Sequence, residues 1–313
     1  METSLRLGVW KGEPSITLIA GERDATFLPG CGMVCASLRD RGGEYVAWPR
    51  SLAQFREGRM TAVPLVHPWG NRLEGRSYRV GRRTVNLSGV DLPTDPNGLP
   101  IHGNLRGAAF DITSADANVR GAQMTARLDY GARPDLLRAF PFPHVLTIEA
   151  RLDERGLRFT TEIEPTGRAA VPISFCWHPY LRIPDAPRRE WVLRWPACER
   201  VLVDERVLPT GEVAAQPVDH SELGQRTFDD HYRLGTDRRF SLAARDREIE
   251  LRFGPTYPFA QLFVPARGDF AAIEPMTATI DALGRRSTPM VAPGDRFRAW
   301  FTLEPRTGEP RTA

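Results

Sequence analysis

The chain has 313 residues, of which 41 % are hydrophobic, and its 42 basic side chains nearly balance 39 acidic ones. This balance, with no long basic run, argues against nucleic acid as a partner, and no apolar stretch is long enough to cross a membrane. The first fifteen residues mix charged and polar side chains without an apolar core, so we expect a cytoplasmic protein without a secretory signal.

Strands are predicted from the beginning of the chain, in short β-prone segments separated by Gly, Pro and charged turns. One short helix is predicted at residues 51–58. The strands expected before that helix are residues 15–22, 26–30, 33–39 and 44–49.

The alternation of apolar and polar side chains is clearest in the middle of the chain. Residues 144–165 form two such runs around a turn at 154–156, which predicts a hairpin with one face exposed to solvent. The same pattern recurs at 239–254 and at 295–305. Because no linker divides these strands, we expect an all-β protein, one large antiparallel β-sandwich, with a single domain over 1–313.

The four cysteines do not predict a metal site. Cys31 and Cys35 have the spacing of half a zinc site, but Cys176 and Cys198 lie far apart and do not complete it. The histidines also lack the HxH and HxxxH spacings of common metal sites. We therefore expect reduced cysteines and no metal.

The segment VPISFCWHPYLRIP, residues 171–184, begins as an apolar, β-prone run and ends abruptly at a histidine. Pro179 disfavours the α conformation for His178, so we expect His178 to be extended at the end of a strand, with its ring held by the sheet. The alternative is a core histidine bonded to a backbone carbonyl.

Glu274 has a similar setting, because it follows the apolar strand 270–273 and precedes a proline. A carboxylate there costs free energy unless it is hydrogen-bonded or chemically used. Just upstream, Gln261 lies inside an apolar strand, where an amide also needs partners.

Residues 66–75 gather polar and aromatic groups suited to a ligand rich in hydroxyls, or alternatively form a turn with a surface arginine. Trp69 supplies a flat ring, while Asn71 and Arg72 supply an amide and a planar guanidinium.

Two further segments carry candidate site residues. His102 precedes Gly103, which indicates a turn where backbone can approach a ligand. Asp229 and Asp230 are adjacent, so in an extended chain only one of them can face a given pocket, and an Asx-type turn is the alternative.

Six short motifs in this order resemble the motif series of the aldose 1-epimerase (galactose mutarotase) family. They are WGNRLEG, LPIHGN, FCWHPYL, FDDHY, AQLFVP and AAIEPMTATIDAL, between residues 69 and 283. The resemblance implies a β-sandwich of the supersandwich type and an enzyme that interconverts the α and β anomers of an aldose. Trp177 and Leu181 depart from the residues common in relatives. The resemblance therefore specifies the identity of the sugar less closely than the type of reaction.

The resemblance also implies roles for single residues. By motif position, Glu274 is the general base and His178 the general acid, with His102 assisting. The positions that match sugar-binding residues are Arg72, Asp229 and Gln261. We expect Asn71 beside them and a tryptophan, Trp69 or Trp177, stacked on the apolar face of the sugar ring.

The implied reaction is proton exchange, which needs a base and an acid but no cofactor and no metal. The expected partner is a small sugar, with phosphorylated and sulfonated sugars left open, and the protein is expected to be a monomer or homodimer. Two alternatives are a non-catalytic carbohydrate-binding or sensing protein on this fold, and a metal-dependent lyase or isomerase with His102, His178 and Glu274 as ligands.

Overall fold

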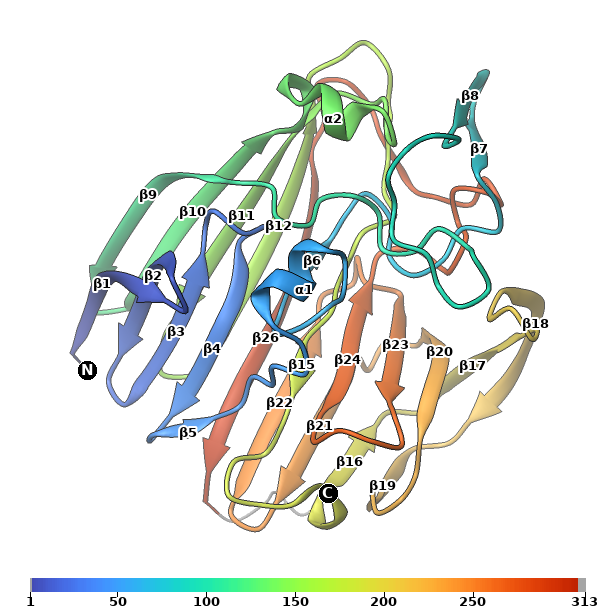
Figure 1. Ribbon diagram of the computed structural model, residues 1–313. Coiled ribbons are helices and arrows are strands. Elements are labelled where there is room, and N and C mark those ends of the chain that lie inside the picture. The colour runs from blue at the N-terminus through green and yellow to red at the C-terminus, as the bar shows by residue number, and fades with distance from the viewer. Residues whose placement is uncertain (1, 309–313) are drawn as a thin grey trace.

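A computed structural model describes residues 2–308, which form antiparallel sheets joined by short loops (Figure 1). The first sheet is a meander in chain order. Its strands are β1 Thr3–Trp10, β2 Glu13–Ala20, β3 Arg23–Leu28, β4 Val34–Asp40 and β5 Gly43–Glu44.

The second sheet has nine strands, in the order β19-β16-β21-β22-β26-β12-β11-β10-β9. Their bounds are β9 Asp111–Asn118, β10 Gly121–Asp129, β11 His144–Leu152, β12 Leu157–Pro165, β16 Val192–Trp195, β19 Asp219–Glu222, β21 Arg239–Ala244, β22 Arg247–Phe253 and β26 Phe297–Thr307. The late strand β26 therefore lies between two pairs that are formed earlier in the chain.

The third sheet runs β18-β17-β20-β23-β24-β14-β6, with β15 also paired to β24. Its bounds are β6 Leu65–Val66, β14 Cys176–Trp177, β15 Tyr180–Leu181, β17 Cys198–Val203, β18 Pro209–Gln216, β20 Phe228–Leu234, β23 Phe259–Val264 and β24 Ala271–Met276. The small elements are the pairs β7 Ser77–Val80 with β8 Arg83–Asn86 and β13 Val171–Pro172 with β25 Met290–Val291, the helices α1 Leu52–Arg56 and α2 Pro134–Leu137, and the 3-10 turns η1 Tyr130–Ala132 and η2 Arg188–Glu190.

The nine-stranded sheet is the layer against which the other two large sheets pack. Phe159 in β12 meets Phe27 of the first sheet, with ring centroids 5.9 Å apart. Phe301 in β26 meets Trp177 of the third sheet at 5.6 Å. These contacts confirm the predicted all-β sandwich. Within residues 2–308, no helix combines the length and the apolar character needed to cross a membrane.

The hairpin predicted at 144–165 is confirmed as β11 and β12, in register from His144 opposite Pro165 to Leu152 opposite Leu157. Its turn requires glycine at Gly156, where φ is 143° and a Cβ atom would collide with the Leu303 carbonyl.

The predicted helix at 51–58 is also confirmed. Helix α1 begins at a capping box in which the Ser51 side chain accepts from Gln54 N and the Gln54 side chain accepts from Ser51 N. One expectation was wrong, and one helix was missed. Residues 44–49 do not form one strand: β5 ends at Glu44, whose side chain accepts from Val46 N, and from there to residue 49 only Val46 pairs, in a single bridge to Leu181. Helix α2, started by Pro134 at its first position, was not predicted.

Two buried histidines form a direct pair beneath the sheets. His67 Nε2 lies 3.0 Å from His144 Nε2, and His144 Nδ1 lies 2.7 Å from Phe142 O. Because a carbonyl only accepts, His144 carries its proton on Nδ1, and His67 donates to the bare Nε2 of His144. Burial lowers the pKa of His144 to about 4 and that of His67 well below its usual value.

This pair predicts that the protein loses stability in mild acid. Unfolded histidines take up a proton near pH 6.5, while His144 stays neutral until about pH 4, so the unfolded state binds more protons in that window and the free energy of unfolding falls as pH falls. Each such histidine contributes up to about 1.4 kcal/mol per pH unit. Urea unfolding at pH 7, 6 and 5 measures this slope.

The matched controls are two histidine substitutions. His144→Leu should give a shallower pH slope, whereas His220→Leu, at an exposed position, should leave the slope unchanged. Equal slopes in the wild type and the His144→Leu variant would contradict the assignment.

Candidate active site

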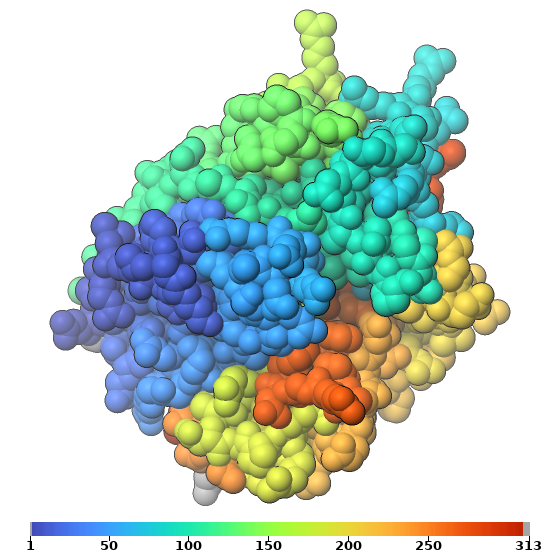
Figure 2. All heavy atoms as spheres, in the orientation of Figure 1, coloured from blue at the N-terminus to red at the C-terminus, as the bar shows by residue number. Residues whose placement is uncertain are grey.

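A cavity of about 850 Å³ opens where the third sheet meets loops of the N-terminal half. Figure 2 shows this side of the molecule, hollowed between the blue N-terminal segments, the teal loop near residue 100 and the orange segments near residue 270. The sequence-predicted residues on its lining are Asn71, Arg72, His102, His178, Asp229, Gln261 and Glu274. Seven of the nine candidates are thus brought together from segments that are far apart in the chain.

His178 is held as its sequence predicts. It follows strand β14, its backbone N–H donates to Pro64 O, and its side chain is only 4 % exposed. Side chains alternate along this extended segment, so Trp177 faces the core while His178 and Tyr180 share a face. The His178 and Tyr180 rings are stacked, with centroids 4.6 Å apart.

Glu274 reaches the cavity from the interior of strand β24, not from its end as expected, because the strand continues through Pro275 to Met276. Pro275, which has no N–H to give, lies opposite Ala260 of β23. The N–H groups two positions before and after it, of Ile273 and Thr277, donate to the other side, to Pro179 O and Phe175 O.

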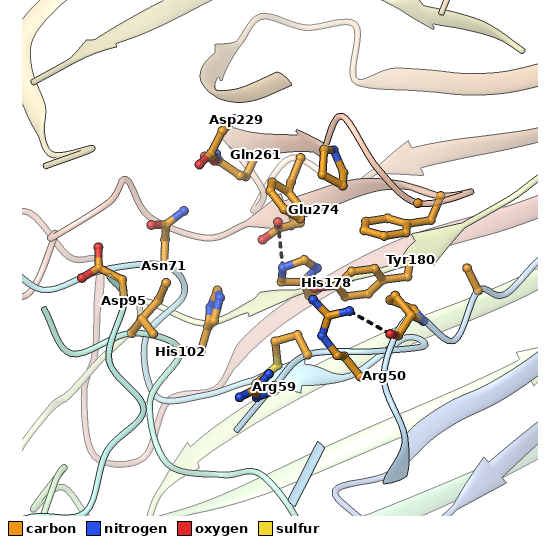
Figure 3. A pocket seen from close by; sticks show the side chains of 18 of the residues that line it. Arg50, Arg59, Asn71, Asp95, His102, His178, Tyr180, Asp229, Gln261 and Glu274 are labelled. Carbon is orange, nitrogen blue, oxygen red and sulfur yellow. Dashed lines mark hydrogen bonds and ion pairs between the residues drawn. The ribbon is translucent and has the colours of Figure 1, made fainter. Parts of the chain in front are cut away.

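The two proposed catalytic groups touch each other. His178 Nε2 and Glu274 Oε1 are 3.1 Å apart, as the dashed line in Figure 3 shows. Burial raises the pKa of Glu274 well above its usual value, Asp229 adds to the rise and Arg72 opposes it. Burial, with a smaller contribution from His102, lowers the pKa of His178 well below its usual value. The opposite shifts bring the two pKa values toward each other.

Arg72 is fixed before any ligand arrives. Its Nε donates to Asp95 Oδ2 at 2.7 Å, and one terminal nitrogen donates to Asn71 Oδ1 at 2.9 Å. Asp95 is held in turn by the N–H groups of Asn97 and Leu99, each 2.9 Å from Oδ1. Burial alone raises the pKa of Asp95, but these donors lower it overall.

Asp229 and Gln261 form the opposite wall, from neighbouring strands β20 and β23. Gln261 Nε2 donates to Asp229 Oδ1 at 2.7 Å, and the buried Gln261 Oε1 has no partner within residues 2–308. Asp230 points to the other face, where Arg200 lies 3.6 Å away. The choice of Asp229 over Asp230 for the cavity agrees with this arrangement.

His102 has an unusual backbone for a non-glycine residue. Its φ is 61° and that of Asn71 is 56°, and the two are joined by a hydrogen bond from His102 N to Asn71 O. Left-handed conformations of this kind cost free energy and are concentrated at ligand sites. Desolvation in the cavity, together with the charge of Arg72, lowers the pKa of His102 to about 3, so its ring is neutral near pH 7.

The two tryptophans were placed wrongly. Trp69 and Trp177 are both 0 % exposed, and neither lines the cavity. Trp177 donates from Nε1 to Thr161 and packs on Phe159, while Trp69 packs against Tyr78. Neither ring is available for stacking on a sugar in this cavity.

Several lining residues were not predicted from the sequence. Tyr180 lies in the FCWHPYL motif, and the sequence could have placed it in the cavity. It comes two positions after His178, on the same face of an extended segment. Asp95 lies in a turn sequence, TDPNG, that gives no sign of an ion pair with Arg72. Further unpredicted lining residues include Trp48, Arg50, Arg59, Arg182, Arg267, Asp269 and Phe270.

The metal alternative required His102, His178 and Glu274 to converge as ligands. Throughout residues 2–308, no three His, Cys, Asp or Glu side chains are grouped in a way that could hold a metal ion.

The sheets and this cavity define an all-β protein of the galactose mutarotase-like fold. Solved structures agree in fold: a galactose mutarotase-like protein from Clostridium acetobutylicum has a TM-score of 0.87 at 17 % identity, over 97 % of this chain and 99 % of that one. Galactose 1-epimerase from Lactobacillus acidophilus has a TM-score of 0.78 at 15 % identity, over 98 % and 99 %. An aldose epimerase homologue from C. elegans has a TM-score of 0.75 at 14 % identity, over 98 % and 100 %.

A family model described as aldose 1-epimerase matches residues 14–304. The chain therefore belongs to the aldose 1-epimerase family, and the family resemblance seen in its six motifs is confirmed. No curated protein sequence matches the chain significantly.

Proposed function

We propose that the protein is an aldose 1-epimerase that interconverts the α and β anomers of a sugar. One observation carries the proposal: a carboxyl and an imidazole touch each other, at 3.1 Å, on the wall of a cavity. The anomeric hydroxyl and the ring oxygen of an aldose are both bonded to C1. A neighbouring base and acid therefore match the two atoms between which the proton must be exchanged.

The reaction follows from that geometry. Glu274 takes the proton of the anomeric hydroxyl while His178 protonates the ring oxygen, and the C1–O5 bond breaks to leave a carbonyl at C1. Rotation about C1–C2 presents the other face of the carbonyl. Closure then reverses both transfers: His178 takes the proton of the C5 hydroxyl as its oxygen attacks C1, and Glu274 returns its proton to the oxygen on C1. Each such positioned transfer is worth about 10²–10⁴-fold in rate.

The pair works when it holds one exchangeable proton in total. If the pair takes up a second proton, neither residue can accept the proton of the anomeric hydroxyl. If the pair loses its only proton, neither residue can protonate the ring oxygen. Since their pKa values are shifted toward each other, the ionisations belong to the pair and not to either residue alone.

Three other lining residues can form hydrogen bonds with the sugar hydroxyls. Arg72 offers donors that Asp95 and Asn71 leave free, Asp229 offers acceptor oxygens, and Gln261 offers its unpaired Oε1. These groups come from separate segments that are already held by their own hydrogen bonds, so little is lost in ordering them when a ligand binds.

The direct test follows freshly dissolved α-D-galactose and α-D-glucose by NMR or polarimetry, corrected for the spontaneous rate. Acceleration by purified protein supports the proposal. Binding of these and related aldoses without any acceleration would favour the non-catalytic sugar-binding alternative instead.

Arg72→Lys should weaken productive binding almost as much as Arg72→Ala, with KM raised by roughly tenfold or more and kcat changed less. A lysine ammonium is a point charge and cannot bond Asp95, Asn71 and a sugar hydroxyl in one plane, as the guanidinium does. Steady-state kinetics on an accepted sugar measures this. Wild-type KM in the lysine variant would show that the planar fork is not used.

A further inference from the structure

The cavity has one end that the proposed chemistry leaves unexplained, and it is centred on Tyr180. The backbone of Tyr180 bonds to both neighbouring segments, since its N–H donates to Ala62 O and its carbonyl accepts from Ala47 N. Its ring stacks on His178 and lies 5.0 Å from the ring of Phe270, measured between centroids. Segments 47–50, 59–62 and 265–270 therefore gather around this end.

Each of these segments carries an arginine onto the cavity lining, and a fourth follows Tyr180 itself. We call these four the arginine rim: Arg50, Arg59, Arg182 and Arg267. Arg182 lies two positions after Tyr180, on the same side of the segment. Arg50 is close enough to Tyr180 for its charge to act on the phenol. Figure 3 shows Arg50 and Arg59 on the side of the cavity away from Asp229 and Gln261.

The arginine rim differs from Arg72 in having no ion-pair partner. All four side chains are exposed, and none forms a salt bridge within residues 2–308, whereas Arg72 is paired with Asp95. The Arg50 side chain donates to the carbonyl of its neighbour Pro49, while the backbone N–H of Arg50 donates to Thr61 Oγ1. The one acid that lines this end is Asp269. Four arginines thus line this end of the cavity, and of the four only Arg50 uses a guanidinium donor in a hydrogen bond within residues 2–308.

A neutral sugar does not need this arrangement, because hydroxyls are satisfied by the single donors and acceptors at the other end of the cavity. Guanidinium groups instead match the oxygens of phosphate and carboxylate, with which they form charge-assisted, often two-pronged hydrogen bonds. We propose that the substrate is an aldose that carries an anionic group, bound by the arginine rim. This inference rests on the proposed function, because it assigns the substrate class of the same site.

The position of the anionic group follows from sugar connectivity. In an aldohexopyranose, C6 is attached to C5, and C5 is bonded to the ring oxygen that His178 protonates. A charged group on C6 therefore lies beyond His178, toward Tyr180, where the arginine rim begins. The anomeric hydroxyl and the hydroxyls on C2 and C3 then lie toward Glu274, Asp229 and Arg72. The sugar spans the cavity with its charged end at the rim.

The size of the cavity agrees with a ligand longer than one sugar ring. Its volume of about 850 Å³ is in the upper part of the range, roughly 300–1,000 Å³, of pockets that take drug-sized molecules. A ring alone would leave the Tyr180 end filled with water and the arginines without a counter-charge.

The experiment compares α-D-glucose 6-phosphate with α-D-glucose in NMR epimerisation assays, using the wild type and the double variant Arg50→Gln/Arg59→Gln. Wild type should have a kcat/KM at least about tenfold higher for the phosphate. The double variant should lower that ratio by about tenfold or more, mainly through KM. Arg82→Gln is the control, because Arg82 is exposed in the β7–β8 turn, away from the cavity, and should leave the ratio unchanged.

The outcomes separate this inference from the proposed function. If the wild type turns over glucose as well as its phosphate, or if the double variant keeps the phosphate preference, the anionic substrate is wrong and the epimerase remains. If no aldose, neutral or charged, is turned over, the proposed function itself fails. Calorimetric binding of glucose 6-phosphate then tests the rim alone: tight binding lost in the double variant supports it, and no binding overturns it.

A third substrate identifies the anion. α-D-Glucuronate places a carboxylate at C6, two bonds closer to the ring than the phosphorus of the phosphate ester. A preference for glucuronate over glucose supports the inference with a carboxylate as the group, and a preference for the phosphate ester supports it with a phosphate. Loss of both preferences at high ionic strength is expected, because the rim is open to solvent.

Discussion

Replacing Glu274 by glutamine is expected to lower kcat by about 10²-fold or more, with little change in folding stability. Glutamine keeps the shape of the side chain and can still hydrogen-bond to His178, which lies 3.1 Å from the carboxyl oxygen, but it cannot accept a proton. Burial already favours the neutral form of Glu274, so a neutral amide should fit the same site. The measurement is turnover of an accepted sugar, beside a thermal melting curve.

A second carboxyl, half-buried, provides the matched control. Glu44 also has its pKa raised by burial, but it lies outside the cavity and accepts hydrogen bonds from the backbone of Leu38 and Val46. Glu44→Gln should change the melting curve more than the turnover. A well-folded Glu274→Gln protein with turnover near that of the wild type would remove Glu274 from the mechanism.

The sequence predicted the site where a local signal was strong enough. A proline after an ionisable residue, at the end of an apolar run, marked both His178 and Glu274. The contact between them depends on the pairing of two strands, in which Cys176 of β14 lies opposite Met276 of β24. The local sequence does not indicate this pairing. The order of the motifs compensates for this, because the family resemblance identifies both residues without any knowledge of the pairing.

Local alternation could have corrected one error. In an extended segment, neighbouring side chains point to opposite faces, so His178 and Trp177 cannot both face the cavity. The 0 % exposure of Trp177 follows from the same rule that places Tyr180 beside the histidine. Trp69 had no such signal, because its segment is irregular and its burial is decided by tertiary packing against Tyr78.

The arginine rim was out of reach of sequence analysis for a different reason. Lys11 is the only lysine among the 42 basic residues, so one more arginine carries almost no information. What distinguishes the four rim residues is that they lack ion-pair partners within residues 2–308 and gather around Tyr180. Both properties depend on segments separated by more than two hundred residues. Only the folded structure can supply them.

Replacing His178 by asparagine is the other change expected to have a large effect, again about 10²-fold or more in kcat. Asparagine keeps a polar side chain beside Glu274 but cannot carry the proton to the ring oxygen. The double variant, Glu274→Gln with His178→Asn, should lose much less than the product of the two single losses, since either change alone already breaks the exchange. Losses that multiply would indicate two independent roles.

The pH dependence gives this prediction its sharpest form. Wild-type kcat should follow a bell, with an acidic limb where the pair takes up a second proton and a basic limb where it loses its only exchangeable one. The raised pKa of Glu274 moves the acidic limb up and the lowered pKa of His178 moves the basic limb down, so the two shifts narrow the active range. In Glu274→Gln only the imidazole still titrates, and the residual rate should follow a single ionisation. A residual rate that keeps both limbs would mean that the second ionising group is not Glu274, and the proton exchange would then have to be assigned to another pair in the cavity.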